Sequence, residues 1–406
     1  MRTVLVTGLG GAGRTTVAAA TALAGARGGT RTLLISADAV PGFPTATEPT
    51  RVTGALWSAR IDSGAHFRSE LLTLQDQLSG VLDLLGGNRM EGEELTELPG
   101  SAELALLHSL RRAAQGDWSR DGYDLLVVDL PPLREALALL ALPGQLRRYL
   151  RRLLPQERQA ARALRPMLAQ LAGVPMPAQR LYEAAARRDA ELARVQALIE
   201  DRATTLRLVA EPGPAAEDAL RAARAGLALH GLRVDALVAN RVLPRHSSDP
   251  WFAALAAQQE KCLDHWHAEG AADAPPLRVP HLGRDPQGPD DLTALAVPDD
   301  APDLSPDSRE GGRADDPWWI EEAAAPEGQD GADGILVWCL RLPGAVKKDL
   351  QLVRRGSELL LTVGPFHRIV PLESALTRCT VSGAALTDGV LRVRFTPDPA
   401  LWPRAS

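Results

Sequence analysis

Short apolar segments that end in glycine, proline or aspartate alternate with helical stretches from the N-terminus to about Leu282. This alternation is typical of βαβ units, in which a helix crosses back over a parallel sheet after each strand. Several of the segments contain almost no polar residues, which indicates strands covered by helices on both faces. We therefore predict an α/β fold with a doubly wound, mostly parallel sheet. The predicted strands are 3–7, 32–36, 55–61, 124–129, 206–210, 236–240 and 277–280.

A glycine-rich loop, GLGGAGRTT, occupies residues 8–16 between the first predicted strand and an alanine-rich helical stretch. Glycines let backbone N–H groups wrap around an anion, and the start of the following helix adds partial positive charge. The alternative is a simple glycine turn, but the strand before and the helix after favour a phosphate-binding loop (P-loop) with the Thr15 hydroxyl at Mg2+. The residues predicted to hold a nucleotide here are Gly8, Gly10, Gly11, Ala12, Gly13, Arg14, Thr15 and Thr16.

Changes in pattern divide the rest of the chain. Residues 1–295 form the predicted α/β domain, and within it leucines and alanines recur at helical spacing over about 144–203, which predicts a helical insert. Residues 296–333 are rich in Asp, Pro, Gly and Glu, as in a flexible acidic linker. Trp318 and Trp319 interrupt this linker, and either docking onto a folded surface or incidental exposure fits them equally well.

The period of the pattern changes to two after the linker. Residues 334–406 are therefore predicted to form a small antiparallel β-sandwich. Its predicted strands are 335–341, 350–354, 358–363, 367–372, 378–382 and 390–395.

Composition excludes several classes of protein. The net charge of −6 argues against binding nucleic acid through the overall field of the protein. The chain has three cysteines and no CxxC pair, too few for a disulfide framework. We find neither a signal-like leader nor a run of about 18 apolar residues, and we expect a cytoplasmic protein that does not span a membrane.

The glycine-rich loop resembles the deviant P-loop of the ATPases that drive arsenite pumps and target tail-anchored membrane proteins, whose pattern is GKGGVGKTT. Two lysines of that pattern are absent. Leu9 stands at the signature lysine, which in the family reaches across a dimer interface to the partner's phosphates. Arg14 stands at the lysine that cradles the β- and γ-phosphates, and it keeps the charge in a bulkier group.

Further segments follow the order of the family. Ile35-Ser36-Ala37-Asp38 is similar to its first switch, which implies that Asp38 orients the attacking water. Asp129 matches the aspartate linked to Mg2+, and Asn240 matches the asparagine that reads adenine. Residues 133–136, Leu-Arg-Glu-Ala, replace the TGHT of the second switch, so its hydroxyls and histidine are lost. Both carboxylates also have a purely structural interpretation, since an aspartate at the end of a strand often caps the next helix.

The C-terminal part carries a second resemblance. Leu342-Pro343-Gly344 and Gly389-Val390-Leu391 are similar to the LPG and GVL signatures of the α-crystallin domain of small heat-shock proteins. The resemblance implies a module whose exposed edge strands recruit another protein. A sandwich that only packs on its neighbour is the simpler alternative.

Two functions follow from these resemblances. The first is a dimeric switch of the arsenite-pump type that binds ATP and Mg2+ and hydrolyses ATP weakly, with Asp38 and Arg14 as catalytic residues and Thr15 and Asp129 at the metal. The second is a degenerate subunit that serves as a scaffold or regulator of an intact paralogue. The expected partners are ATP, a second copy or a paralogue, and a protein client bound through the helical insert or the C-terminal module.

Overall fold

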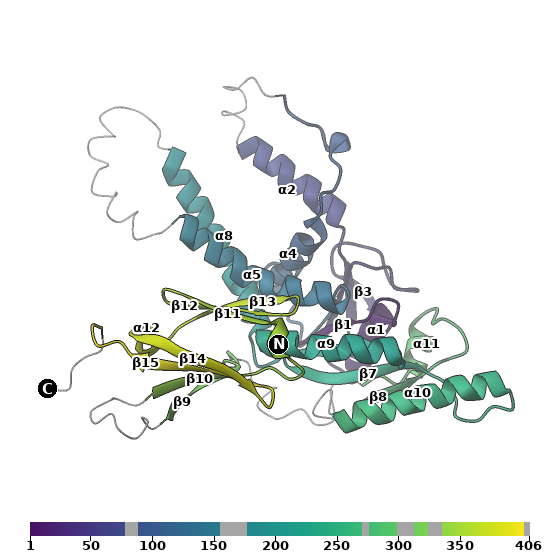
Figure 1. The fold of residues 1–406 in the computed structure, drawn as a ribbon. Coiled ribbons are helices and arrows are strands. Elements are labelled where there is room, and N and C mark those ends of the chain that lie inside the picture. The colour runs from purple at the N-terminus through teal and green to yellow at the C-terminus, as the bar shows by residue number, and fades with distance from the viewer. Residues whose placement is uncertain (78–87, 155–176, 270–275, 299–311, 324–334, 402–406) are drawn as a thin grey trace.

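A computed structural model describes residues 1–77, 88–154, 177–269, 276–298, 312–323 and 335–401, and Figure 1 shows its fold. The N-terminal part contains one large sheet with the helices packed around it. The C-terminal strands form two smaller sheets beside it. The α/β class predicted from the sequence is confirmed, as is the antiparallel character of the C-terminal part.

The large sheet has eight strands in the order β3-β4-β2-β5-β1-β6-β7-β8. All neighbours are parallel except β3, which pairs antiparallel with β4 at the edge. β1 lies near the middle, between β5 and β6, so the loop that follows it is surrounded by the carboxyl ends of its neighbours. The strands are β1 (Arg2–Gly8), β2 (Thr32–Ser36), β3 (Thr50–Thr53), β4 (Leu56–Arg60), β5 (Leu125–Asp129), β6 (Thr204–Ala210), β7 (Val234–Val242) and β8 (Leu277–Pro280).

Helices cover both faces of this sheet, which explains the unbroken apolar segments. Val4 and Val6 of β1 pack with the alanines of α1 on one face, whereas Leu5 belongs to the core under α4, α5 and α9 on the other. None of the described helices combines the length and the apolar character needed to cross a bilayer. The longer helices are α1 (Arg14–Arg27), α2 (Ser63–Gln77), α4 (Ser101–Gln115), α5 (Leu133–Leu153), α8 (Pro177–Ile199), α9 (Pro214–His230) and α10 (Pro250–Glu269), and the short α11 is Pro289–Ala294.

Two pairs of helices project from the sheet on one side in Figure 1, α2 with α4 and α5 with α8. The predicted insert corresponds to the outer part of α5 and to α8. The helix does not start at the predicted boundary, since α5 continues through the buried Pro143 to Leu153. Asp189 of α8 accepts hydrogen bonds from Arg147 (3.1 Å) and Arg151 (3.4 Å) of α5, which ties the pair together. Residues 155–176 lie outside the described part of the chain.

The C-terminal strands form a sandwich of two antiparallel sheets, β14-β15-β10-β9 and β11-β12-β13. Buried Trp338, Leu359, Leu361 and Phe395 lie between them. Six of the strands were predicted within a few residues. The strands are β9 (Trp318–Ala323), β10 (Ile335–Arg341), β11 (Leu350–Arg355), β12 (Glu358–Val363), β13 (Phe366–Pro371), β14 (Cys379–Thr387) and β15 (Val390–Pro397), with the one-turn helix α12 (Ser374–Thr377) before β14.

Strand β9 lies inside 296–333, where the sequence predicted a flexible linker. For residues 318–323 that prediction is wrong, because they pair with β10 from Trp318 opposite Leu340 to Ala323 opposite Ile335. The Trp318 ring lies 6.1 Å from that of Trp338, and the Arg368 guanidinium is stacked 4.9 Å from the Trp318 ring. The tryptophan pair therefore docks onto the sandwich, which was one of its two interpretations. The strand was missed because two glutamates and flanking prolines mask its pattern.

The sandwich packs directly on the α/β domain. The ring of Phe366 at the start of β13 sits so close to Gly226 of α9 that a Cβ there would come within 2.8 Å of the ring carbons. Glu358 of β12 accepts two hydrogen bonds of 2.8 Å from Arg148 of α5, and Arg368 donates to the carbonyl of Leu229 at 2.5 Å. Apolar residues of both parts consequently form one continuous cluster.

We expect Phe366 to decide whether Gly226→Ala lowers or raises the free energy of unfolding. Gly226→Ala alone lowers the free energy of unfolding, because the new methyl meets the ring. Phe366→Ala alone costs about 3 kcal/mol for the lost buried ring. In the Phe366→Ala background Gly226→Ala is neutral or stabilising, since the space is free and alanine favours a helix by up to about 1 kcal/mol. Urea unfolding of the four proteins measures this.

The control is Gly144→Ala in α5, where a Cβ has only ordinary contacts of 3.7 Å or more, with Gln196. It should be neutral or stabilising in both backgrounds. Equal effects of Gly226→Ala with and without Phe366 would contradict the packing of the two domains against each other.

Candidate functional site

The predicted P-loop connects β1 to α1 at the carboxyl edge of the large sheet. Gly8 ends β1 against β6, where a Cβ would lie 1.9 Å from the carbonyl oxygen of Val209. Gly11 and Gly13 have φ values of +78° and +86°, a backbone region that side chains other than glycine rarely adopt. The loop therefore needs glycine for packing at one position and for backbone shape at two others.

Four hydroxyl and carboxylate side chains meet beside this loop. The Thr15 hydroxyl of α1 donates to Oδ2 of Asp129 at 2.7 Å, and the Ser36 hydroxyl of β2 donates to the same oxygen at 2.9 Å. Ser36 also accepts a hydrogen bond of 3.1 Å from the backbone N–H of Asp38. Asp38 is exposed, with Oδ2 3.3 Å from the Thr15 hydroxyl. The structure thus brings together Thr15, Asp38 and Asp129, which are far apart in the chain.

Asp129 combines burial with an unused oxygen. The residue is 6% exposed, and burial raises the pKa of its carboxyl, although the hydrogen bonds from Thr15 and Ser36 and the charge of Arg14 act in the opposite direction. Oδ1 is buried and has no hydrogen-bond partner. A buried carboxylate oxygen without a partner is costly, and a cation or its water would satisfy it. Together with the Thr15 hydroxyl and the exposed Asp38, it provides the hard oxygen ligands that Mg2+ prefers.

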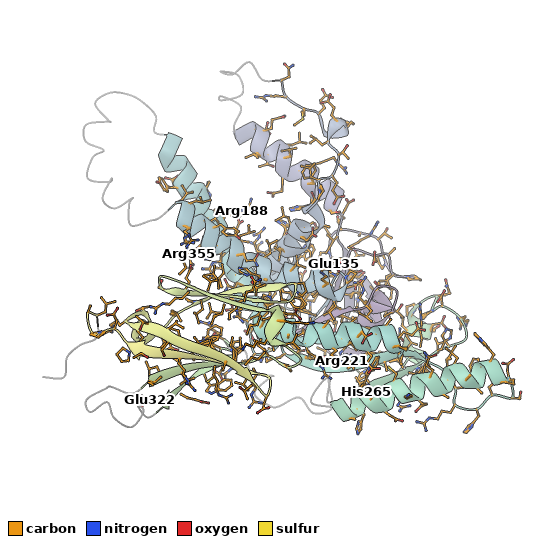
Figure 2. The ribbon with its side chains drawn as sticks, in the orientation of Figure 1. Glu135, Arg188, Arg221, His265, Glu322 and Arg355 are labelled. Atoms are coloured by element: carbon orange, nitrogen blue, oxygen red, sulfur yellow. The ribbon has the colours of Figure 1, made fainter. Side chains whose placement is uncertain are left out.

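The two positions that depart from the family pattern take on different contacts. The guanidinium of Arg14 donates to the carbonyl oxygen of Leu130, directly beyond β5. Leu9 is half-buried and packs against both hydrophobic clusters, so its side chain faces the protein. In the replaced second switch, Leu133 and Ala136 are buried in the first turn of α5, while Arg134 and Glu135 are exposed. Figure 2 labels Glu135 at this end of α5.

A cavity of about 480 Å3 opens next to the loop, lined in part by Thr15, Thr16, Asp38 and Asn240. The amide of Asn240 donates to the carbonyl oxygen of Ala12 at 2.8 Å and sits beneath Gly13. Another wall is formed by Pro280, the last residue of β8, and by the loop 281–288 that follows it. The cavity therefore joins the P-loop to the separate loop that follows β8.

Two features of this cavity were not predicted from the sequence. Arg241, with a φ of +55°, donates to the carbonyl of Gly11 at 3.1 Å and pairs with Glu211 at 3.4 Å. The wall at 281–288 is held by the ion pair between Arg284 and Asp291. Arg241 directly follows Asn240, a predicted nucleotide contact. This neighbouring position is the sequence signal that could have placed Arg241 at the cavity. The wall is an irregular loop without a sequence signal.

Comparison with known proteins agrees with this fold and site. A model of the anion-transporting ATPase family matches residues 1–297, and a model of the HSP20-like domain found in such ATPases matches residues 333–395. The chain is thus a P-loop ATPase-fold protein with an appended HSP20-like sandwich. It belongs to the anion-transporting ATPase family, as the resemblance of its P-loop implied.

Relatives extend over the full length of the chain. An uncharacterized protein of Streptomyces coelicolor is 56% identical over all of both chains. A Mycobacterium tuberculosis protein is 31% identical over 99% of this chain and 97% of its own length. A protein of Aquifex aeolicus named a putative arsenical pump-driving ATPase is 25% identical and covers 93% of this chain and 95% of its own.

Two glycines of the loop provide a matched pair of substitutions. Gly8→Ala should lower the free energy of unfolding by more than about 2 kcal/mol, because β1 must move away from β6. Gly10→Ala should leave stability unchanged, since nothing lies within 4 Å of its Cβ position. Chemical denaturation of both variants checks this, and equal stabilities would contradict the described contact of Gly8 with Val209.

Proposed function

We propose that this protein is a cytoplasmic, dimeric switch that binds Mg-ATP in the cavity beside the P-loop and hydrolyses it slowly. The observation that carries the proposal is the Asp129 carboxylate. One of its oxygens accepts hydrogen bonds from Thr15 and Ser36, and the other is buried and has no hydrogen-bond partner. Family membership supports ATP and Mg2+ as the ligands.

In this proposal each residue has a defined task. The backbone N–H groups of Gly10 to Gly13 and the start of α1 hold the phosphates, as a helix N-terminus with a glycine loop does elsewhere. Thr15 and Asp129 hold Mg2+, which would neutralise charge on the β- and γ-phosphates. Asp38 is exposed at the mouth of the cavity and orients the attacking water. Asn240 contacts the adenine.

Slow turnover follows from where positive charge is missing. Phosphoryl transfer depends on cations around the γ-phosphate, and loss of a cation of the arginine-finger kind costs about 10³ to 10⁵ in rate. Leu9 packs inward and brings no charge. Arg14 keeps a charge, but its guanidinium donates to the carbonyl of Leu130.

A second function, a non-catalytic scaffold or regulator, is favoured by one observation. Leu9, Leu133 and Ala136 occupy positions of catalytic groups in the family pattern and instead pack into the core. Such packing favours a P-loop that keeps its structure in a protein that does not hydrolyse ATP. A protein client bound by the projecting helices or by the sandwich fits either function.

Kinetics on purified protein separates the two functions. We expect nucleotide binding with a turnover roughly 10³-fold below that of an intact relative, because cations are missing. Arg14→Lys should raise the turnover, and Asp38→Asn should abolish it. The matched control is Asp264→Asn on the surface of α10, which should change nothing. Binding without any Asp38-dependent turnover, or no binding of Mg-ATP at all, would contradict the switch and select the scaffold.

The partner follows from the role of the signature lysine in the family. In a homodimer both sites lack this charge. In a heterodimer the signature lysine of an intact paralogue completes the site built by Gly10 to Thr15, whereas Leu9 supplies no charge to the site of the paralogue. We therefore propose an asymmetric heterodimer. Capture of the tagged protein from native cytosol with Mg-ATP, followed by mass spectrometry, should recover a relative with both lysines. Recovery of monomers or homodimers alone would contradict it.

A further inference from the structure

Two histidines and a glutamate converge between the projecting helices α2 and α4. His66 and Glu70 are four residues apart on α2, so both point from the same face of that helix. His108 reaches them from α4, which packs against α2. Within the described part of the chain, this is the one group of three or more His, Cys, Asp or Glu side chains whose ligand atoms all lie within 4.8 Å of one another.

The two imidazole rings face each other across the helix contact. Their centroids are 4.6 Å apart, and the rings are tilted by 42°. Both residues are half-buried, and Glu70 is exposed beside them. None of the three residues lines the cavity beside the P-loop, so the cluster is separate from the nucleotide site.

The protonation of the cluster suits metal ligands, which must present free lone pairs. Burial lowers the pKa of His108 to about 4, with a further contribution from the neighbouring His66 and Arg111. Burial also lowers the pKa of His66, against the opposing charge of Glu70. A neutral imidazole has one ring nitrogen with a free lone pair, and this nitrogen is the one that binds a metal ion.

We infer that His66, Glu70 and His108 form a three-ligand site for a divalent first-row transition ion, with Zn2+ as the best fit. Two imidazoles and one carboxylate are a known zinc ligand set that leaves a fourth position open. Tetrahedral bonds of about 2.0–2.1 Å place ligand atoms about 3.3 Å apart. Side-chain rotations that draw the three groups together by an ångström or so complete the site, without movement of the helices.

Arg188 of α8 opposes the ion. Its guanidinium lies 3.3 Å from Glu70 and 3.1 Å from Glu191. An ion bound by Glu70 competes with this contact and faces the repulsion of Arg188 and of Arg111, which lies 3.5 Å from the His108 ring nitrogen. The Glu70–Arg188 pair connects α2 to α8. Metal binding would therefore replace this contact between the two helix pairs by a contact between α2 and α4, which belong to one pair. Figure 2 labels Arg188 on α8.

The test is direct binding of Zn2+ to the full-length protein after chelation and dialysis. Competition with a chromophoric chelator should give one equivalent of Zn2+ per chain. Glu70→Gln, a nearly isosteric change at an exposed side chain, should weaken binding by more than about tenfold, as should His108→Ala. Arg188→Ala should strengthen it, because a competing cation is removed.

Cobalt provides a readout of the ligands themselves. Co2+ should give visible absorption bands with the wild type that are lost in Glu70→Gln. The control is His246→Ala, which removes an exposed histidine elsewhere and should bind like the wild type. No stoichiometric binding to the wild type, or equal affinities of wild type and Glu70→Gln, would overturn the inference. Circular dichroism of each variant confirms that it is folded.

Discussion

The carboxylate of Asp129 is the contact on which the site depends. It lies at the end of β5, where the parallel neighbours β1 and β2 also end, and its Oδ2 accepts hydrogen bonds from Ser36 of β2 and Thr15 of α1. Burial disfavours the charged form of this carboxyl, and the hydrogen bonds from the two hydroxyls offset part of that effect. The P-loop links β1 to α1, and the hydrogen bond from Thr15 of α1 to Asp129 helps to hold the far end of the loop in place.

The positions of most strands and much of the candidate site could be predicted because they follow from local patterns. Apolar segments marked the buried strands, and glycine spacing marked the P-loop. Strands β3 and β9 were missed because both are at sheet edges, where half of the residues face solvent and the apolar signal fades. The contact of Arg14 with Leu130 depends on β5 lying next to β1, and no local pattern contains this information.

The C-terminal sandwich shows how a boundary drawn from composition differs from one drawn by packing. Acidic and proline-rich residues marked a linker, but the tryptophans within it supply enough apolar surface to add a strand to the sandwich. Phe366 and Gly226 then join the sandwich to α9 at van der Waals distance. The two family models end and begin near residues 297 and 333, so the segment between them lies outside both yet contributes β9 to the fold.

Helix α5 reaches both of these parts. Its first turn, at Leu133, follows Asp129 by only four residues, and 15 residues further on Arg148 is bonded to Glu358 of β12. An α-helix rises about 1.5 Å per residue, so the two points are separated by about 22 Å of helix, with Pro143 between them. One continuous helix therefore connects the Asp129 end of the sheet directly to the Arg148–Glu358 contact with the sandwich.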